Sequence, residues 1–217
     1  MSTFNVRTIR NSSNIGELIA AAEKYQIDII GIQEHRIHHA DTDIKFHQLT
    51  NSWQLITTSA TQNTIGATVG GVAILLSPYA GRSLINVETI SPRLMICHFQ
   101  GNPATTVLCC YSPTNYAKEE DITSFYNDLR EAVKTIPRHN IQIILGDMNA
   151  RIGTDKAKFA YCKSTNRNGE HLINFSEEYG YILGNTRFQK SKSKQWTARL
   201  PNGHKAQLDY IMINRKC

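Results

Sequence analysis

Residues 141–145, Ile-Gln-Ile-Ile-Leu, are followed at once by Gly-Asp-Met-Asn, and this stretch constrains the fold more than any other. A short run rich in isoleucine and leucine is typical of a strand buried on both faces of a sheet. Gly146 is expected to end the strand, which leaves Asp147 and Asn149 on the same side of an extended backbone. Ligands bind at the carboxyl ends of strands in α/β sheets, so this point is a candidate functional site. An ordinary polar turn is the alternative, because short motifs also occur by chance.

Other predicted strands carry polar side chains in a similar way. They are Asn5 (within a strand predicted at 4–8), Glu34 (after 27–33), Tyr111 (at the end of 105–111) and Asp209 (within 207–213). A charge inside an apolar strand is costly unless it is paired, so a dedicated partner is expected for Asp209. Taken singly, Glu34 is a solvated loop residue and Tyr111 an amphipathic residue at a sheet rim. Together they suggest one site built from several strand ends.

Helical patterns alternate with these strands. Asn14 with Glu17 resembles a capping box for a helix that ends near Gln26, residues 119–136 form the clearest amphipathic helix, and a third helix ends at Gly180. Further strands are predicted at 53–58, 71–77, 83–88, 93–99 and 181–184, with a polar, flexible loop at 59–70 and a turn at Pro201-Asn202-Gly203 that pairs Trp196-Thr197 with 207–213. This order predicts an α/β fold, a four-layer sandwich of two mixed β-sheets packed face to face and flanked by helices.

Composition limits the classes of protein to consider. The 217 residues, with 41% hydrophobic and 19% charged side chains, predict a single globular domain spanning residues 1–217. A net charge of +6 and a pI near 9.1 favour nucleic acid or another polyanion as partner. No apolar leader or membrane-spanning run is present, so a nuclear or cytoplasmic protein with no membrane association is expected.

The five cysteines include no Cys-x-x-Cys pair, and their odd number argues against a disulfide framework or a thiolate zinc site. No disulfide-linked partner is expected, and the oligomeric state is left open. Cys109 and Cys110 are adjacent on a predicted strand and should face opposite sides of the sheet.

The segment Glu34-His35-Arg36-Ile37-His38-His39 raises a zinc hypothesis. His35 and His39 share a face only in a helix, and nothing in the sequence marks a helix start there. A zinc site also needs a third ligand and an ordered second shell. Arg36 is a candidate phosphate contact beside an acidic site, and a solvated surface arginine is the alternative.

The candidate site offers oxygen ligands and no convincing set of histidines or thiolates. Oxygen donors favour a hard cation, Mg²⁺ or Mn²⁺. In a basic protein, carboxylates with such a cation suit the hydrolysis of phosphoesters, in which a carboxylate positions or deprotonates water.

Five stretches, in this order, carry a resemblance to a known family. They are Phe4-Asn5-Val6-Arg7, Ile32-Gln33-Glu34, Tyr111-Ser112-Pro113-Thr114, Gly146-Asp147-Met148-Asn149 and Gln207-Leu208-Asp209-Tyr210. The chain resembles the endonuclease/exonuclease/phosphatase superfamily, and more narrowly the apurinic-endonuclease-like domain of non-LTR (LINE-type) retrotransposons and host proteins similar to it. The resemblance implies a Mg²⁺-dependent phosphodiesterase that nicks DNA.

The resemblance also implies roles for single residues. Glu34 would be the principal metal ligand with Asn5 beside it. Asp147 would activate the attacking water and Asn149 would hold a phosphate oxygen. Tyr111 would contact the scissile phosphate and Asp209 would orient a catalytic histidine. DNA or phosphate contacts would come from Arg36, Thr114, Asn115 and Thr197.

The sequence departs from the family pattern at its end. The family continues to a Ser-Asp-His segment that supplies a histidine and a last strand, and this sequence stops before one. His204 lies in the turn before Asp209 and is a poor substitute. We therefore expect a C-terminally truncated domain whose last strand is missing and whose activity depends on a histidine that it lacks. The alternatives are a catalytically inactive protein that binds nucleic acid or another partner, or another phosphoesterase of the same superfamily. A DNA nuclease is expected to cluster Arg36, Arg151 and Arg167 around the acidic residues.

Overall fold

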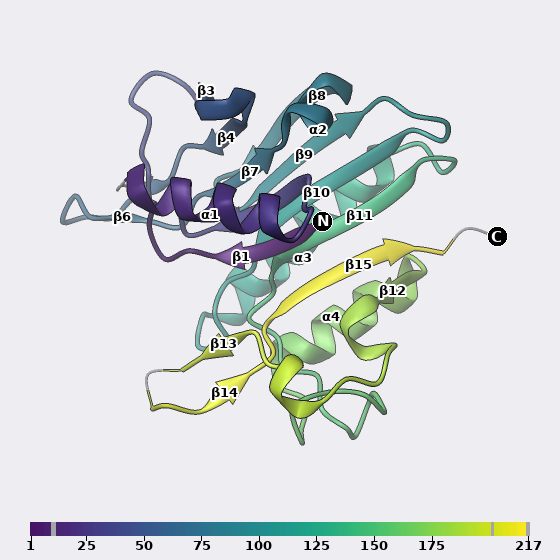
Figure 1. Ribbon diagram of the computed structural model, residues 1–217. Helices are drawn as coiled ribbons and strands as arrows, with labels where there is room; N and C mark the ends of the chain where they lie inside the picture. The colour runs from purple at the N-terminus through teal and green to yellow at the C-terminus, as the bar shows by residue number, and fades with distance from the viewer. Residues whose placement is uncertain (10–11, 201, 216–217) are drawn as a thin grey trace.

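Two large mixed sheets form the centre of the molecule in the computed structural model, which describes residues 1–9, 12–200 and 202–215 (Figure 1). One sheet has the strand order β1 (Ser2–Asn5), β2 (Ile29–Gln33), β7 (Val72–Leu76), β4 (Gln54–Thr58), β3 (Ile44–Gln48). The other has the order β12 (Tyr181–Leu183), β15 (Asp209–Asn214), β11 (Ile141–Asp147), β10 (Thr105–Tyr111), β9 (Leu94–Phe99), β8 (Leu84–Ser91). Each sheet contains one parallel pair, β1–β2 and β10–β11. The predicted α/β fold with two mixed sheets is confirmed.

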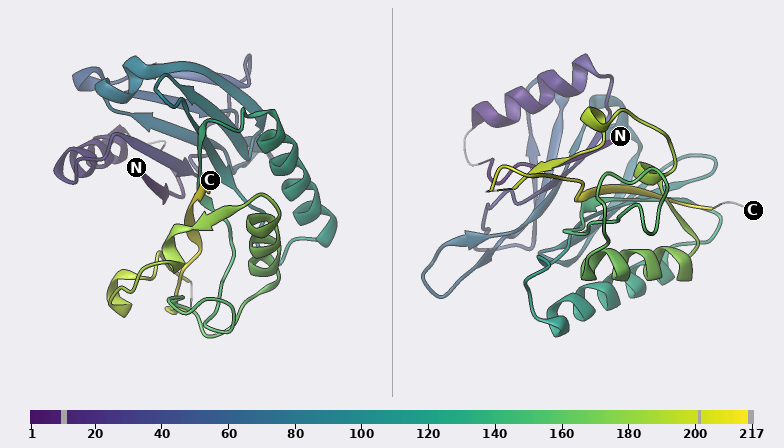
Figure 2. Two further views of the ribbon diagram at one scale, coloured as in Figure 1. Left: turned by 90° about the vertical axis from the view of Figure 1, so that its right-hand side faces the viewer. Right: turned by 90° about the horizontal axis from the view of Figure 1, so that it is seen from below.

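Three apolar clusters separate four layers of structure. Ile74, Met95 and Leu145 belong to the cluster between the two sheets. The outer face of the six-stranded sheet packs on α3 (Glu119–Thr135) and α4 (Arg167–Glu178). The outer face of the five-stranded sheet packs on α1 (Ser12–Lys24). In Figure 2 α1 lies on one side of the sheets and α3 and α4 lie together on the other.

Several predicted boundaries are wrong. The helix α1 begins at Ser12, so Asn14 lies inside it and donates from its side chain to the carbonyl of Thr8. The strand β1 ends at Asn5, earlier than the predicted 4–8. The strand β3 and the short helix α2 (Pro78–Ser83) were not predicted, because β3 is largely polar and exposed and α2 is too short for a periodic pattern. The predicted flexible loop at 59–70 contains a small hairpin, β5 (Thr61–Gln62) with β6 (Thr68–Val69).

The glycine of the Gly-Asp-Met-Asn stretch does not end its strand. Gly146 lies within β11, opposite Cys110 of β10, and Asp147 is the last residue of the strand. A Cβ atom at Gly146 would lie 2.3 Å from the carbonyl oxygen of Cys110. Glycine is therefore used here for close approach of two strands, which carries Asp147 to the very end of β11.

The C-terminal segment forms less of a hairpin than predicted. Only β13 (Ala198–Arg199) and β14 (Lys205–Ala206) pair with each other, and Pro201 in the predicted turn lies outside the described residues. The following strand β15 leaves this hairpin and pairs with β11 and β12. It thereby enters the six-stranded sheet and places Asp209 opposite Asp147.

The cysteines behave as the sequence predicts. Cys97, Cys109, Cys110 and Cys162 are free thiols, and Cys217 lies outside the described residues. Cys109 faces the cluster between the sheets and Cys110 faces the one under α3 and α4, as alternation along β10 requires. Among the described residues, no helix is long and apolar enough to cross a membrane.

Candidate active site

Polar side chains from both sheets meet at the ends of β1, β2 and β11. Asn5 lies at the end of β1, Glu34 directly after β2, and Asp147 at the end of β11. The side-chain nitrogen of Asn5 donates to Oε1 of Glu34 at 2.9 Å and to Oδ2 of Asp147 at 2.9 Å. One carboxamide therefore bridges a carboxylate of each sheet, as the strand-end prediction requires.

The carboxylate of Glu34 has donors on both of its oxygens. Its Oε1 also accepts from the hydroxyl of Tyr111 at 2.9 Å, and its Oε2 pairs with the guanidinium of Arg36 at 2.7 Å. Burial opposes ionisation, but the hydrogen bonds from Asn5, Arg36 and Tyr111 outweigh it and hold the pKa of Glu34 below its usual value. Glu34 is therefore ionised at neutral pH. Tyr111, expected at the scissile phosphate, uses its hydroxyl on Glu34, and burial beside this carboxylate raises the pKa of the phenol.

The carboxylate of Asp147 lies deeper and is held by its own strand end. Its Oδ1 accepts from the backbone N–H of Asn149 at 2.9 Å, and the side chain of Asn149 donates to the carbonyl of Ser112 at 2.9 Å. Burial raises the pKa of Asp147, and the neighbouring charge of Glu34 adds to the rise against the opposing hydrogen bonds. The two central carboxylates therefore differ in basicity, with Asp147 the better proton acceptor.

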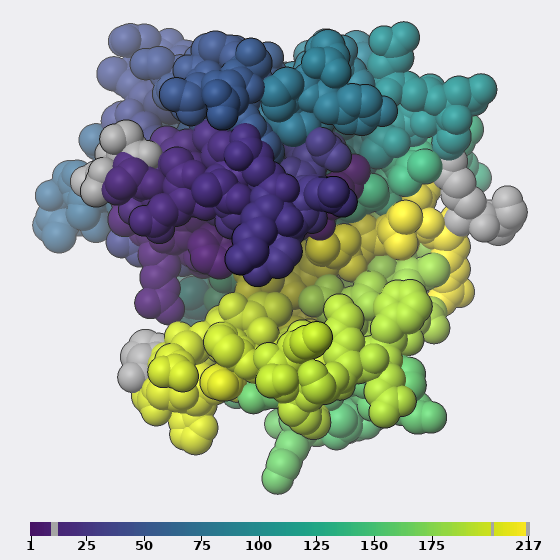
Figure 3. All heavy atoms as spheres, in the orientation of Figure 1, coloured from purple at the N-terminus to yellow at the C-terminus, as the bar shows by residue number. Residues whose placement is uncertain are grey.

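A cleft of about 1020 Å³ opens above these groups. Its floor includes Asn5, Glu34, Asp147 and Asn149, and its walls come from β1 on one side and from the hairpin β13–β14 and β15 on the other. In Figure 3 the N-terminal residues and the C-terminal residues face each other across this hollow. Arg7 and Arg199 stand at the cleft and are linked by a hydrogen bond from the Arg7 guanidinium to the carbonyl of Arg199 at 3.3 Å.

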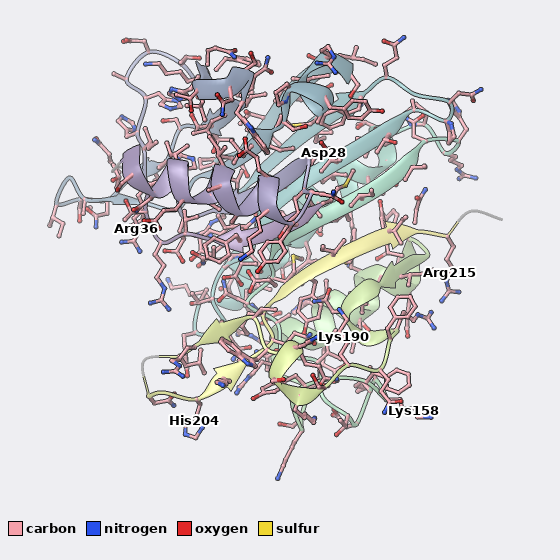
Figure 4. All side chains as sticks on the ribbon, in the orientation of Figure 1. Asp28, Arg36, Lys158, Lys190, His204 and Arg215 are labelled. Atoms are coloured by element: carbon pink, nitrogen blue, oxygen red, sulfur yellow. The ribbon has the colours of Figure 1, made fainter. Side chains whose placement is uncertain are left out.

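Asp209 lies at the start of β15, next to Asp147, and faces the same cleft. Burial, with Asp147 nearby, raises the pKa of Asp209 to about 7. Thr197 accepts from the backbone N–H of Asp209 at 3.1 Å and of Leu208 at 3.0 Å, and it lines the cleft as expected. Oδ1 of Asp209 is buried without a hydrogen-bond partner within the described part of the chain. His204 is exposed on the hairpin and points away from the cleft (Figure 4).

The remaining predicted contacts divide between the cleft and the scaffold. Thr114 lines the cleft. The side chain of Asn115 instead accepts from the backbone of Asn168 at 3.3 Å, in the first turn of α4. The guanidinium of Arg167 donates to the carbonyls of Asn115 and Ala117 and pairs with Glu119, so it joins α3 to α4. Of the expected cluster of Arg36, Arg151 and Arg167, Arg36 does pair with the acidic residue Glu34. Arg167 instead joins α3 to α4, and the arginines that line the cleft are Arg7 and Arg199.

The backbone around the cleft is strained. Arg7, Glu34, Arg36 and Asn149 have φ values of 58°, 57°, 58° and 46°, in the left-handed region that side chains other than glycine rarely adopt. Non-glycine residues in this region cluster at functional sites, where the surrounding structure holds them in place. Gln26, Asn51 and Ser52 share this conformation away from the cleft, so the backbone agrees with a functional site here and does not identify one by itself.

The histidines after Glu34 do not form the zinc site considered above. Residues 34–41 form no helix. His35 is fully buried against Gly71 and accepts from the backbone N–H of Ile37 at 3.0 Å, so it stabilises the turn that presents Glu34. His39 contacts the hydroxyl of Thr57 instead. Across the described residues, no three His, Cys, Asp or Glu side chains gather in a metal-binding arrangement.

Sequence reasoning missed Asn185, which follows β12 and lines the cleft. Its side chain donates to the carbonyl of Asp209 at 3.1 Å and accepts from the N–H of Ile211 at 3.0 Å, which fixes the start of β15. The signal was available, because Asn185 directly follows the strand predicted at 181–184, just as Glu34 follows the one predicted at 27–33. Arg7 was assigned to the strand predicted at 4–8 and not to the site. Its position depends on a left-handed backbone conformation that the sequence does not indicate.

The donors at the floor of the cleft fit a hard divalent cation in their chemistry. The ionised carboxylate of Glu34 is the ligand that this site offers. Asn5 presents its nitrogen to the two carboxylates, and its oxygen accepts from the backbone N–H of Arg7 at 3.0 Å. In this orientation the Asn5 carboxamide positions Glu34 and Asp147 instead of offering an oxygen to the cation.

The fold and this set of strand-end residues define a class of α/β phosphoesterase-like domains. The model of the endonuclease/exonuclease/phosphatase family matches residues 2–216, and the chain belongs to this family. Among curated proteins it is similar to craniofacial development protein 2 of Bos taurus, with 27% identity, and of Tragulus javanicus, with 26% identity. Each alignment covers 100% of this chain and 36% or 37% of the relative, so the chain spans about a third of these proteins.

Solved structures share the fold at low sequence identity. An AP endonuclease from Leishmania major superposes with a TM-score of 0.69 and 12% identity, covering 98% of this chain and 78% of that one. A 3′ phosphatase from Neisseria, solved with a product DNA hairpin, superposes with a TM-score of 0.68 and 15% identity, covering 98% and 85%. These likenesses confirm the fold.

Proposed function

We propose that this chain is a Mg²⁺-dependent DNA endonuclease domain that nicks a DNA strand. The observation that carries the proposal is the carboxamide of Asn5, which joins Glu34 of one sheet to Asp147 of the other at the floor of an open cleft. Two carboxylates of different basicity, held side by side beneath a cleft with arginines at its rim, suit the hydrolysis of a phosphodiester.

The residues of the chain divide the work. Asp147 accepts the proton of the attacking water, and its raised pKa makes it a stronger base at neutral pH than an ordinary aspartate. The hydrogen bond from the backbone of Asn149 fixes the Asp147 carboxylate. The side-chain amide of Asn149 gives one proton to the carbonyl of Ser112, and its second proton would be donated to a phosphate oxygen in the cleft. Tyr111 and Arg36 hold Glu34 in place. Thr114 and Thr197 lie where the substrate backbone passes.

Glu34 would hold Mg²⁺ or Mn²⁺, with Asn5 positioning it. When bound, such a cation polarises the phosphoryl oxygen and offsets the charge that develops on it. The ion pair with Arg36 keeps the Glu34 carboxylate charged in the absence of substrate.

Charge and family relationships support DNA as the substrate. The chain has a net charge of +6, and structures of the same fold include an AP endonuclease and a phosphatase bound to a DNA hairpin. The five stretches shared with LINE-type endonuclease domains, and the similarity to craniofacial development protein 2, support a retrotransposon origin.

A second candidate function follows from Asp209. Its buried Oδ1 has no partner among the residues described, although the resemblance assigns this aspartate to a catalytic histidine. If no histidine pairs with this carboxylate, the domain would bind nucleic acid or another partner and cut slowly or not at all, since loss of one member of a catalytic unit commonly costs several orders of magnitude in rate.

The experiment is nicking of supercoiled plasmid in Mg²⁺ by the wild-type chain and by two matched variants. Asp147→Asn removes the proposed base. Asp43→Asn makes the same substitution at an exposed aspartate that does not line the cleft. We expect nicking by the wild type and by Asp43→Asn, and a loss of ~10³-fold in Asp147→Asn.

A third protein, the chain extended by a family-type Ser-Asp-His strand, separates the two candidates. If only the extended protein nicks, the site is catalytic and Asp209 requires its histidine. If all of the proteins fold and none of them nicks DNA, the endonuclease function is refuted and the catalytically inactive binding protein is the candidate that stands.

A further inference from the structure

A second group of cations lies outside the cleft, on two segments of the chain that contain no carboxylate. Residues 156–163 contribute three lysines, and residues 187–194 contribute Arg187, Lys190, Lys192 and Lys194. We call these two segments together the lysine-rich face. Aspartate and glutamate are absent from both segments, in a chain whose net charge is only +6.

Specific contacts hold the two segments together. Lys192 donates to the carbonyl of Tyr161 at 3.4 Å and lies over its ring at 5.5 Å. The buried side chain of Gln195 donates to the carbonyl of Phe159 at 3.2 Å. The carbonyl of Gln195 accepts in turn from the buried side chain of Gln207 at 2.7 Å. The like charges are therefore brought together by the fold and are not independent loop residues.

Among the described residues, most of these cations have no carboxylate as an ion-pair partner. Lys156 pairs with Glu170 at 3.3 Å. Within the described part of the chain, Lys158, Lys190 and Lys194 have no acidic side chain within ion-pair distance, and all three are exposed. Phe188 stands among them with 67% of its surface exposed, and Lys158 lies over the ring of Phe159. Concentrated unpaired positive charge interleaved with aromatic rings suits the backbone and bases of nucleic acid.

The lysine-rich face is continuous with one wall of the cleft. Residue 194 is followed by the buried Gln195, and Thr197, Ala198 and Arg199 then line the cleft directly. Figure 4 shows Lys190 and Lys158 on the lower half of the molecule, with Lys190 nearer to β15 and Lys158 farther away. Along the chain, the segment 187–194 therefore leads directly into this wall of the cleft.

We propose that the lysine-rich face binds the phosphate backbone of the DNA substrate outside the cleft, on one side of the nicked bond. This inference rests on the proposed function for the identity of the polyanion. It assigns Lys190, Lys192 and Lys194 to affinity and to the position of the DNA, and assigns them no part in the chemical step.

The test compares two triple variants that lose the same charge. One is K190Q/K192Q/K194Q, and the control is K24Q/K45Q/R82Q, whose residues lie on α1, β3 and α2, on the side of the five-stranded sheet. Circular dichroism and thermal melts establish that both fold. Binding of a fluorescein-labelled duplex of about 30 base pairs is measured by anisotropy in EDTA over a series of salt concentrations, because the salt dependence counts phosphate contacts.

We expect the lysine-rich-face variant to bind at least ~10-fold more weakly, and the slope of log K against log salt to fall by roughly 2–3, because each phosphate contact contributes ~0.9. The control variant should match the wild type. In plasmid nicking, the lysine-rich-face variant should raise KM and leave kcat unchanged.

The outcomes separate this inference from the proposed function. Equal affinities of the two variants would refute a role for the lysine-rich face while leaving nicking untouched. Binding through this face with no nicking by the wild type refutes the endonuclease function and leaves the surface standing. Tighter binding of an RNA duplex of the same sequence would overturn DNA as the partner.

Discussion

Glu34 is the residue on which the proposed chemistry of the site depends, because it accepts hydrogen bonds from both sheets while remaining ionised. Asn5 reaches it from β1 and Tyr111 from β10, and Arg36 neutralises its second oxygen. Three donors to one carboxylate stabilise its charged form, which offsets the cost of partial burial. Under the proposed function, this carboxylate would exchange the guanidinium of Arg36 for a metal ion.

Replacement of Glu34 by glutamine tests this role directly. The amide keeps the shape but loses the charge, so we expect Mn²⁺ to bind at least ~10-fold more weakly, since a neutral amide oxygen attracts a hard cation less than a carboxylate does. Titration calorimetry with Mn²⁺ measures the change without reference to activity. Glu23→Gln on α1 is the control, and equal Mn²⁺ affinity in both variants would show that Glu34 is not the ligand.

Single residues were predictable from the sequence where their chemistry is local. Asn5, Glu34, Asp147 and Asp209 were found because a polar residue at a strand end is an anomaly that can be read directly. The hydrogen-bond roles were not predictable. The sequence suggests Tyr111 for the phosphate, whereas its hydroxyl bonds Glu34, and it suggests Asn115 for DNA, whereas its side chain caps α4. Such choices depend on rotamers and on neighbours that are distant in sequence.

At the scale of elements, the pair β10–β11 is the one that brings the site together. The close approach at Gly146 lets both strands run to their ends in register, so that Tyr111 lies opposite Asp147. A side chain at position 146 would collide with the backbone of β10, which cannot move without shifting Tyr111.

We expect Gly146→Ala to destabilise the protein by roughly 3 kcal/mol, the usual order of an overpacked core, which lowers Tm by about 10 °C in a domain of this size. Gly16→Ala is the matched control. Gly16 lies in α1 with open space around it, so the same change there should stabilise by about 0.5–1 kcal/mol. Differential scanning calorimetry gives both values. Equal stabilities of the two variants would contradict the close contact of β10 with β11.

Elements with strong periodicity were predictable and irregular ones were not. The predicted bounds of the helix α3 and of the strands β2 and β10 lie close to the observed ones. Each apolar face of these elements packs into one apolar cluster, and this regular burial produces a clear pattern in the sequence. The strand β3 was missed because its exposed, polar residues contact the core weakly. The predicted pairing partner of β15 was wrong. A local turn suggested a hairpin, whereas β15 pairs with β11, a strand distant in sequence.

At the scale of the whole molecule, the site straddles the boundary between the two sheets. The cluster between the sheets includes residues of both, and Asn5 links them at the cleft. Neither sheet can lose its structure without exposing the apolar face of the other. Such a domain is expected to unfold as one cooperative unit.

The two tryptophans report on this cooperativity from different places. Trp53 is buried against α1 on the five-stranded side, whereas Trp196 lies beneath Lys205 beside the hairpin β13–β14. We expect the variants Trp53→Phe and Trp196→Phe, each with one remaining fluorophore, to unfold in urea with midpoints that agree within about 0.3 M once corrected for the stability lost by each substitution. An earlier transition for Trp196 alone would show that the hairpin and the adjoining lysine-rich face unfold separately.

The left-handed backbone at Arg7, Glu34, Arg36 and Asn149 has a consequence for how such a protein can change over generations. Glycine would relieve the conformational cost at each of these positions, so selection for stability alone would replace these side chains. Drift toward glycine there would give a more robust protein with an emptier cleft. The two arginines, the glutamate and the asparagine at these positions thus carry a conformational cost that we expect to be offset by what their side chains do at the site.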